Sequence, residues 1–103
     1  MKTDRELLEA AARAAKMPYA WNPGAELMLH TQPDANALYW RPLDDDGDAL
    51  RLSVKTGEPF VVRRGCVTTM GGLFQKFDPS VPGDDLRATR RIIVRAAAMA
   101  QKE

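Results

Sequence analysis

The chain has 103 residues, of which 45% are hydrophobic and 28% charged, and its 15 Lys and Arg against 14 Asp and Glu leave a net charge of +1. This length and composition fit one globular domain over residues 1–103, and the charge balance excludes any bulk attraction to nucleic acid or membrane. One cysteine, Cys66, rules out an intrachain disulfide. Because the N-terminus lacks a signal segment and no window approaches the ~18 apolar residues of a membrane span, we expect a cytoplasmic protein.

Helices are predicted at both ends of the chain. Thr3-Asp4-Arg5-Glu6 is a capping-box pattern and Pro18 ends the apolar periodicity that follows, so the first helix is expected over residues 4–16. Two aspartates open the last helix, expected over residues 84–101. Its apolar stripe consists of Leu86, Thr89, Ile93, Ala96, Ala97 and Ala100.

Five short runs bounded by turn residues are predicted as strands, because they are too short for helices and rich in β-branched or aromatic residues. They cover residues 26–30, 35–40, 60–63, 66–70 and 73–77. The last two flank Gly71-Gly72, a hairpin signal, since the tight turns that join such strands require positive φ.

Residues 48–54 fit two patterns. Leu50, Leu52 and Val54 alternate as in a strand, but the acids before them and Gly57 after them favour a helix over residues 46–56. Asp46 or Asp44 is the expected N-cap.

The predicted order is therefore α-β-β-α-β-β-β-α. This order favours an α+β protein built as a three-layer α/β/α sandwich, with three helices around a small mixed sheet of four or five strands. The strands on either side of the central helix are candidates for a right-handed parallel βαβ unit.

Four aspartates between Asp44 and Asp48 suggest either a metal site or the start of a helix. Placing Gly47 at the sixth position of a calcium loop leaves Pro42 at the first position and Ser53 at the twelfth, where carboxylates are required. No glycine-rich phosphate loop accompanies the cluster. Helix capping is therefore the favoured interpretation, and no metal ligand or cofactor is expected.

No catalytic residue is expected either. His30 is the only histidine, the GxSxG motif of serine hydrolases is absent, and Cys66 falls in a predicted strand, where a buried inert thiol is the default.

Two sets of side chains are candidates for binding. Four arginines share one face of the last helix and could contact phosphates, although a solvated face is the simpler interpretation; they are Arg87, Arg90, Arg91 and Arg95. Tyr39 and Trp40 are of the types that anchor protein interfaces, or else they fill the core.

Three motifs resemble a family of small bacteriophage and prophage proteins. They are D-R-E-L-L-E-x-A-A-x-A-A at Asp4–Ala15, W-x-P-L-x-D-D-G-D-A-L-R-L-x-V-K at Trp40–Lys55, and D-P…A-T-R-R-x-I-V-R-A-A-A within Asp78–Ala98. Residues 18–36 and the hairpin do not match, and residues 81–85 lengthen the approach to the last helix. The family is associated with a "phage ABA sandwich" domain and is distantly similar to lambdoid NinX-type accessory proteins.

The resemblance implies a phage or prophage protein made in the cytoplasm of a bacterial host, and it carries no catalytic residue. The leading hypothesis is a non-enzymatic accessory protein that binds another protein or forms a homo-oligomer. The alternative is a nucleic-acid-binding module that uses the arginine face. A metal-dependent enzyme using Asp44, Asp45, Asp46 or Asp48 is the third and least favoured hypothesis.

Overall fold

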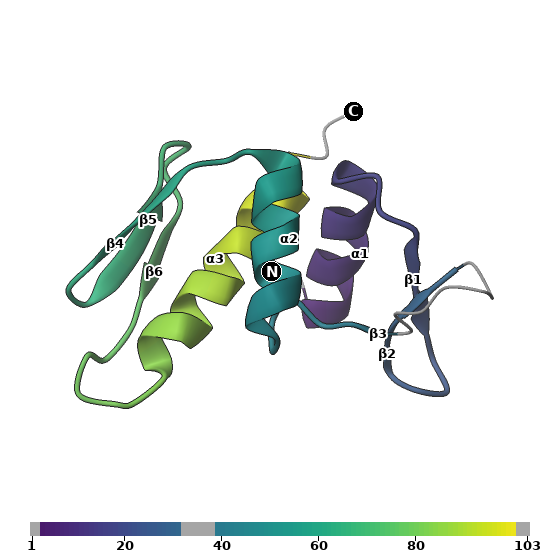
Figure 1. Cartoon of the computed structure of the whole chain (residues 1–103), viewed down its shortest axis with the longest axis horizontal. Coiled ribbons are helices and arrows are strands. Elements are labelled where there is room, and N and C mark those ends of the chain that lie inside the picture. The colour runs from purple at the N-terminus through teal and green to yellow at the C-terminus, as the bar shows by residue number, and fades with distance from the viewer. Residues whose placement is uncertain (1–2, 32–38, 101–103) are drawn as a thin grey trace.

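One helix, α3 (Asp84–Met99), runs through the middle of the protein in the computed structural model, which describes residues 3–31 and 39–100. Helices α1 (Asp4–Ala14) and α2 (Asp46–Thr56) both pack against it. A three-stranded sheet lies at each end of the molecule, with the helices between them (Figure 1). No helix in the described ranges is long and apolar enough to cross a membrane.

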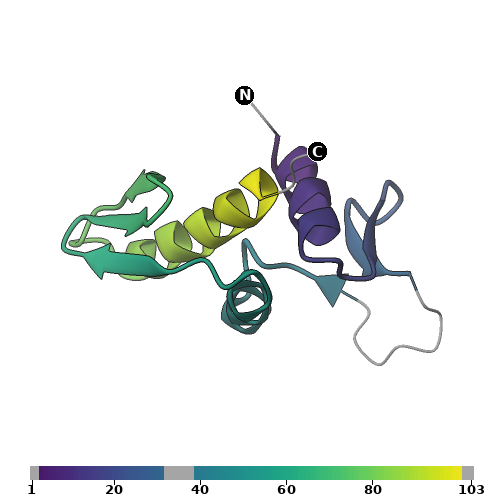
Figure 2. The ribbon, with the colours of Figure 1, turned by 90° about the horizontal axis from the view of Figure 1, so that it is seen from above.

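Both sheets are antiparallel and are built from neighbouring segments of the chain. The first contains β1 (Tyr19–Asn22), β2 (Leu27–His30) and β3 (Tyr39–Trp40), with β2 in the centre. The second contains β4 (Phe60–Arg63), β5 (Cys66–Thr69) and β6 (Phe74–Lys76), with β5 in the centre. Figure 2 shows the two sheets on opposite sides of the helices.

The α+β class is confirmed, but the expected arrangement is wrong in three respects. The strands form two sheets rather than one mixed sheet of four or five. The strands before and after α2 belong to different sheets, so no parallel βαβ unit exists among the described residues. Since the helices lie between the sheets, the three-layer sandwich is also wrong (Figure 1). Within each sheet a strand pairs with its neighbour in the chain, because antiparallel strands need no long crossover connection.

β1 was not expected, so the order is α-β-β-β-α-β-β-β-α. The prolines and the glycine that flank this strand suggested a loop. In the structure, Pro18 directly precedes the strand, and Pro23-Gly24 lie in the turn between β1 and β2. The Asn22 Oδ1 accepts a hydrogen bond from Ala25 N–H at 2.9 Å in that turn. Of the strand expected over residues 35–40, Tyr39–Trp40 is confirmed as β3, and residues 35–38 lie outside the described ranges.

The helix ends follow from local chemistry. In α1 the capping box is complete: Glu6 N–H donates to Thr3 Oγ1 at 3.2 Å, and Thr3 N–H donates to Glu6 Oε1 at 2.8 Å. In α2 the helical interpretation is confirmed, and Gly57 closes the helix at a φ of 72°. The N-cap is Asp45, not Asp46 or Asp44 as predicted, because the Asp45 carboxylate accepts from Asp48 N–H at 2.8 Å.

Small and branched side chains make up most of the core around α3, and Met28 and Trp40 of the first sheet are also buried. Ala11 of α1 and Ala88 of α3 are fully buried, and such small residues let two helices approach closely. The predicted stripe of α3 is only partly correct: Ile93 and Ala97 are buried, but Leu86 is exposed. Since α3 contacts α1, α2 and the second sheet, its buried residues extend around more than one face.

Leu50 and Leu52 allow a direct test of the α2 assignment. Leu52 is fully buried and Leu50 is 63% exposed, whereas in a strand both would lie on one face. We expect Leu52→Ala to lower the free energy of unfolding by about 2–5 kcal/mol, because it leaves a cavity in the core. Leu50→Ala, the matched control on the same helix, should change it by less than about 0.5 kcal/mol. Urea unfolding of both variants measures this, and equal losses would contradict the helix.

Candidate functional site

The aspartate cluster builds the corner between β3 and α2. Asp45 caps the helix, while Asp48 turns back and accepts from Arg41 N–H at 2.9 Å and from the Arg51 guanidinium at 2.6 Å. Asp46 forms a 2.7 Å ion pair with Arg90 of α3. Three of the four carboxylates are thus used to start and anchor the helix, as the capping interpretation predicts. The described part of the chain holds no group of three or more His, Cys, Asp and Glu side chains placed to bind a metal ion.

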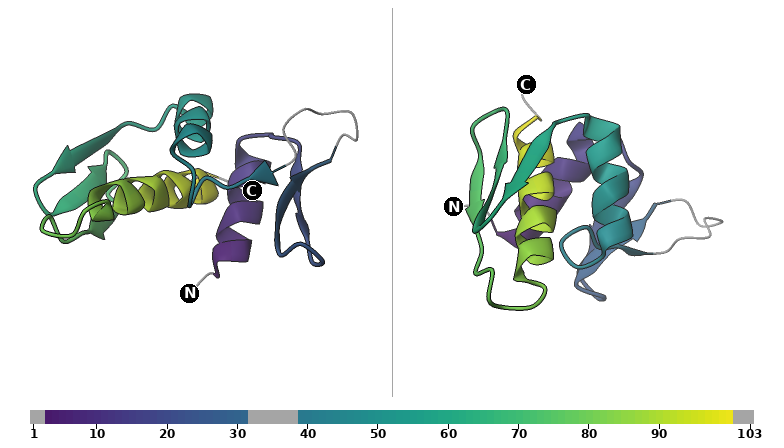
Figure 3. Two further views of the ribbon diagram at one scale, coloured as in Figure 1. Left: turned by 60° about the horizontal axis from the view of Figure 1, so that its bottom comes forward. Right: turned by 60° about the vertical axis from the view of Figure 1, so that its left-hand side comes forward.

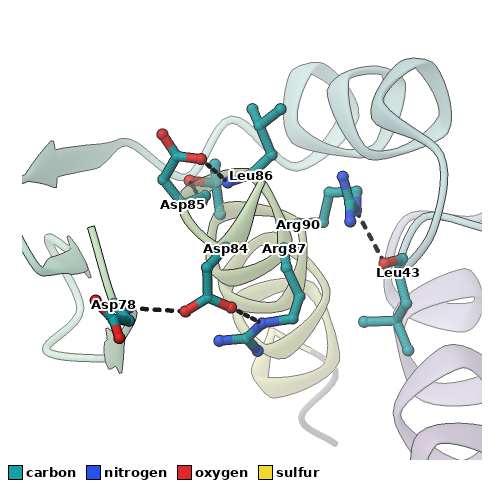
Figure 4. A network of polar contacts seen from close by, with 8 residues as sticks. Leu43, Asp78, Asp84, Asp85, Leu86, Arg87 and Arg90 are labelled. Atoms are coloured by element: carbon teal, nitrogen blue, oxygen red, sulfur yellow. Dashed lines mark hydrogen bonds and ion pairs between the residues drawn. The ribbon is translucent and has the colours of Figure 1, made fainter. Parts of the chain in front are cut away.

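The arginine face of α3 is occupied by contacts within the chain. Arg90 bridges to the α2 corner, where its Nε donates to Leu43 O at 2.9 Å in addition to the Asp46 ion pair (Figure 4). Arg91 pairs with Asp4 of α1 at 3.0 Å, and Arg95 donates to Phe74 O of β6 at 2.9 Å. Arg87 pairs within its own helix with Asp84 at 2.6 Å. Three of these four arginines therefore fasten α3 to three other parts of the fold.

Tyr39 and Trp40 are neighbours with opposite environments. Tyr39 is exposed, but Trp40 is only 1% exposed and stacks on Tyr19, with ring centroids 5.1 Å apart and planes 5° apart. The His30 ring contacts the Tyr19 ring edge-on, with ring centroids 5.1 Å apart. Burial, and then the charge of Asp48, raise the pKa of Tyr19. Trp40 is thus a core residue, so of the two alternatives for this side chain the core-filling one is correct.

An apolar groove that was not predicted lies between α2, α3 and the start of β4. It has a volume of about 240 Å³, and its lining is mostly apolar, with Leu50, Phe60, Leu86 and Ile93 among the lining residues. Leu50 and Leu86 are more than half exposed, and Val54 is 76% exposed one turn along α2 from Leu50. Figure 3 (left) shows β4 and α2 on the same side of α3. The sequence signal for this groove was the four-residue spacing of Leu50 and Val54. This spacing places both side chains on one face of α2, whereas Leu52 lies on another face.

A second hollow of about 240 Å³ lies at the other end of the molecule, between α1 and the first sheet. Its lining is mixed in charge. The Arg5 guanidinium lies 5.4 Å from the centre of the Trp21 ring, and Glu26, Arg41 and Asp44 also line the hollow. The lining therefore contains both acids and bases, whereas the lining of the groove is mostly apolar.

Comparison of the chain with protein-family models, with curated proteins and with solved structures finds no match. The groove and the contacts around it are therefore the features that bear on function.

Arg90 and Arg87 provide a matched pair for testing the role of the arginine face. Arg90→Ala removes both the ion pair to Asp46 and the hydrogen bond to Leu43 O, and Arg90 is the less exposed of the two side chains. We expect it to lower the free energy of unfolding by about 1–2 kcal/mol. Arg87→Ala removes one exposed pair within a helix and should cost at most about 0.5 kcal/mol. Chemical denaturation of both variants measures the difference, and equal effects would contradict the fastening role.

The segment that leads into α3 is held by two acids with lowered pKa values. Asp84 accepts from Arg87 Nε at 2.6 Å and from Asp78 N–H at 2.7 Å, and these bonds, the Arg87 bond first, lower the pKa of its carboxyl (Figure 4). The side-chain and backbone groups of Ser80 lower the pKa of Asp78 in the same way.

A carboxyl whose pKa is lower in the folded state stabilises the fold above its unfolded pKa, near 3.8, and this contribution is lost as the pH falls through the folded pKa. We therefore expect Asp84→Asn to make unfolding less sensitive to acid below about pH 4. Asp85→Asn, at the next position and outside this network, is the control. Urea unfolding at a series of pH values compares the two, and identical acid profiles would contradict the assignment.

Proposed function

We propose that this chain is a non-enzymatic protein-binding module, an accessory protein of phage or prophage origin, and that its contact surface is the apolar groove between α2, α3 and β4. The observation that supports the proposal most directly is the meeting of exposed aliphatic side chains from different elements at one concave place. Leu50 comes from α2 and Leu86 from α3, and Phe60 of β4 lines the groove beside them.

The physical basis is desolvation. Each of these side chains exposes apolar surface to water in the isolated chain, and covering it is worth about 25 cal/mol per Å². Contiguous apolar surface with a polar rim is typical of protein-binding sites. Polar groups are present beside the apolar ones, because Asp46 and Arg90, which form an ion pair, also line the groove.

The arginine face of α3 remains the alternative surface, for nucleic acid, but it is the weaker candidate. Arg90, Arg91 and Arg95 would have to leave Asp46, Asp4 and Phe74 O to reach phosphates, or share these donors. Two of the three are paired with carboxylates, which offset the positive charge on which phosphate binding depends. A metal-dependent reaction at the aspartate corner is less favoured still, since Asp45, Asp46 and Asp48 already have partners.

The proposal predicts that a double variant, Leu50→Asp with Leu86→Asp, loses the partner. Placing two carboxylates in an apolar contact surface should reduce capture of a specific protein from bacterial lysate by about tenfold or more. Met99→Asp is the matched control: Met99 is also an exposed apolar residue of α3, about 20 Å along the helix from Leu86. Quantitative pull-down with the wild-type chain and both variants measures the effect. Equal retention by all three would refute the groove as the contact surface, provided that circular dichroism shows the variants to be folded.

A further inference from the structure

β4 is an open edge of the second sheet. On its inner side it pairs with β5, and no element among the described residues pairs with its outer side. The backbone groups that face outward follow from the ladder. Met70 N–H donates to Pro59 O on the β4 side of β5, whereas Thr69 N–H donates to Leu73 O on the β6 side. Since bonded and non-bonded pairs alternate in an antiparallel ladder, the N–H and C=O groups of Phe60 and Val62 point away from β5.

The other edge of the same sheet is protected. By the same alternation, the outward-facing groups of β6 include Phe74 O, and this carbonyl accepts a hydrogen bond from Arg95 of α3 at 2.9 Å. The neighbouring Gln75 side chain accepts from the same guanidinium nitrogen at 2.9 Å. Uncovered edges are sites at which a further strand can be added, and folded proteins usually block them. The sheet therefore has one blocked edge and one open edge.

The side chains of β4 define what a strand added at this edge must carry. Val62 lies opposite Val67, which is fully buried, so the even-numbered residues Phe60 and Val62 face the α3 side of the sheet, where Phe60 also lines the groove. Residues opposite them on an added strand point to that same side and need to be apolar. Val61 and Val62 are each about half exposed on the isolated chain, so an added strand would cover apolar surface as well.

The charges at the two ends of β4 are opposite. Glu58 precedes the strand, and Arg64 lies in the turn that follows it. Glu58 accepts one hydrogen bond, from Gly71 N–H at 3.1 Å, and neither residue takes part in an ion pair among the described residues. An added strand that runs antiparallel to β4 should thus carry a base near Glu58 and an acid near Arg64.

β4 itself meets all of these requirements. We propose that two copies of this chain associate through antiparallel pairing of their β4 strands, centred on Val61. In this register Phe60 faces Val62 of the second copy, so the outward N–H and C=O groups on both strands find each other. Shifting the register by one residue would set an outward-facing residue against an inward-facing one.

The same register places Glu58 beside Arg64 of the second copy, and the two-fold symmetry repeats this pair. The β4–β5–β6 sheets of the two copies then form one continuous antiparallel sheet, in which neither β4 strand is an open edge. This inference deepens the proposed function, because it names one partner for the surface that includes β4.

The experiment is sedimentation equilibrium of the full chain over a range of concentrations, with wild type expected to approach twice the mass of one chain. Val62→Pro removes an outward N–H without breaking a bond to β5, and it should leave a monomer. Val62→Thr, which keeps the N–H and the β-branch, is the matched control and should still associate. Circular dichroism of each variant reports folding.

Charge reversal tests the register independently of folding defects at Val62. Glu58→Lys and Arg64→Glu should each raise the dissociation constant about fivefold to tenfold, because each sets like charges opposite one another. The double variant restores opposite charges and should return to within about threefold of wild type. Failure of this rescue, or association that Val62→Pro leaves unchanged, would overturn the β4 pairing.

A wild-type chain that stays monomeric at every concentration would overturn self-association. The groove proposal would then be decided by the pull-down experiment alone. If Val62→Pro then abolished that capture, the edge would belong to a different protein. Conversely, the wild-type chain could form a dimer that shows this charge rescue, while the Leu50→Asp, Leu86→Asp double variant captures protein as well as wild type. This result would support β4 pairing and refute the groove as the contact surface.

Discussion

The structure depends on the burial of α3 by three different neighbours. Ala88, Ile92, Val94 and Ala97 are all fully buried, although they cannot all lie on one narrow stripe of a helix. α1 covers one part of this surface, α2 a second and the second sheet a third. Each of the other parts is small, and a three-stranded sheet or an 11-residue helix would be marginal alone in water. Their shared contact with α3 is what makes them one fold.

Polar contacts reinforce the same arrangement at its borders. Arg90, Arg91 and Arg95 project from α3 in different directions and reach the α2 corner, α1 and β6, respectively. A guanidinium group suits this work because its planar donors can serve a carbonyl and a carboxylate at once, as Arg90 does. The consequence for function is that the most basic part of the surface is used in holding the fold together. Binding is better sought where apolar groups and backbone donors have no such use.

The two ends of the molecule differ in that respect. At the first sheet, Trp40 and Tyr19 stack and close the core, and the nearby hollow has a mixed lining. At the second sheet, Val61, Val62 and Leu86 are about half exposed, and β4 has an open edge. Arg95 covers β6 on the opposite side, so β4 is the open one of the two edges of this sheet. The groove and the open edge both lie at this end, which is why the proposed contact surface and the proposed β4 pairing are placed there.

The sequence by itself determined what depends on neighbours within a few residues. The capping box at Thr3–Glu6, the stop at Gly57 and the glycine hairpin after β5 are local hydrogen-bond and φ requirements, and each was found where it was predicted. The cap of α2 was misplaced by one residue, because consecutive aspartates are chemically equivalent in a sequence. β1 was missed, because proline and glycine mark the ends of a strand and a loop alike.

Only the tertiary structure decided the rest. The division of the strands into two sheets and the partners of the four α3 arginines were not predicted, and the sequence left open whether Trp40 lies in the core or at an interface. Most of these contacts join residues distant in the sequence, as in the Arg91–Asp4 pair and the Arg90–Asp46 pair. A helical face of arginines has the same pattern whether it meets solvent, phosphate or a carbonyl of another strand. Which of these it meets is set by the packing of α3, because that packing brings distant carboxylates and carbonyls within reach of each guanidinium.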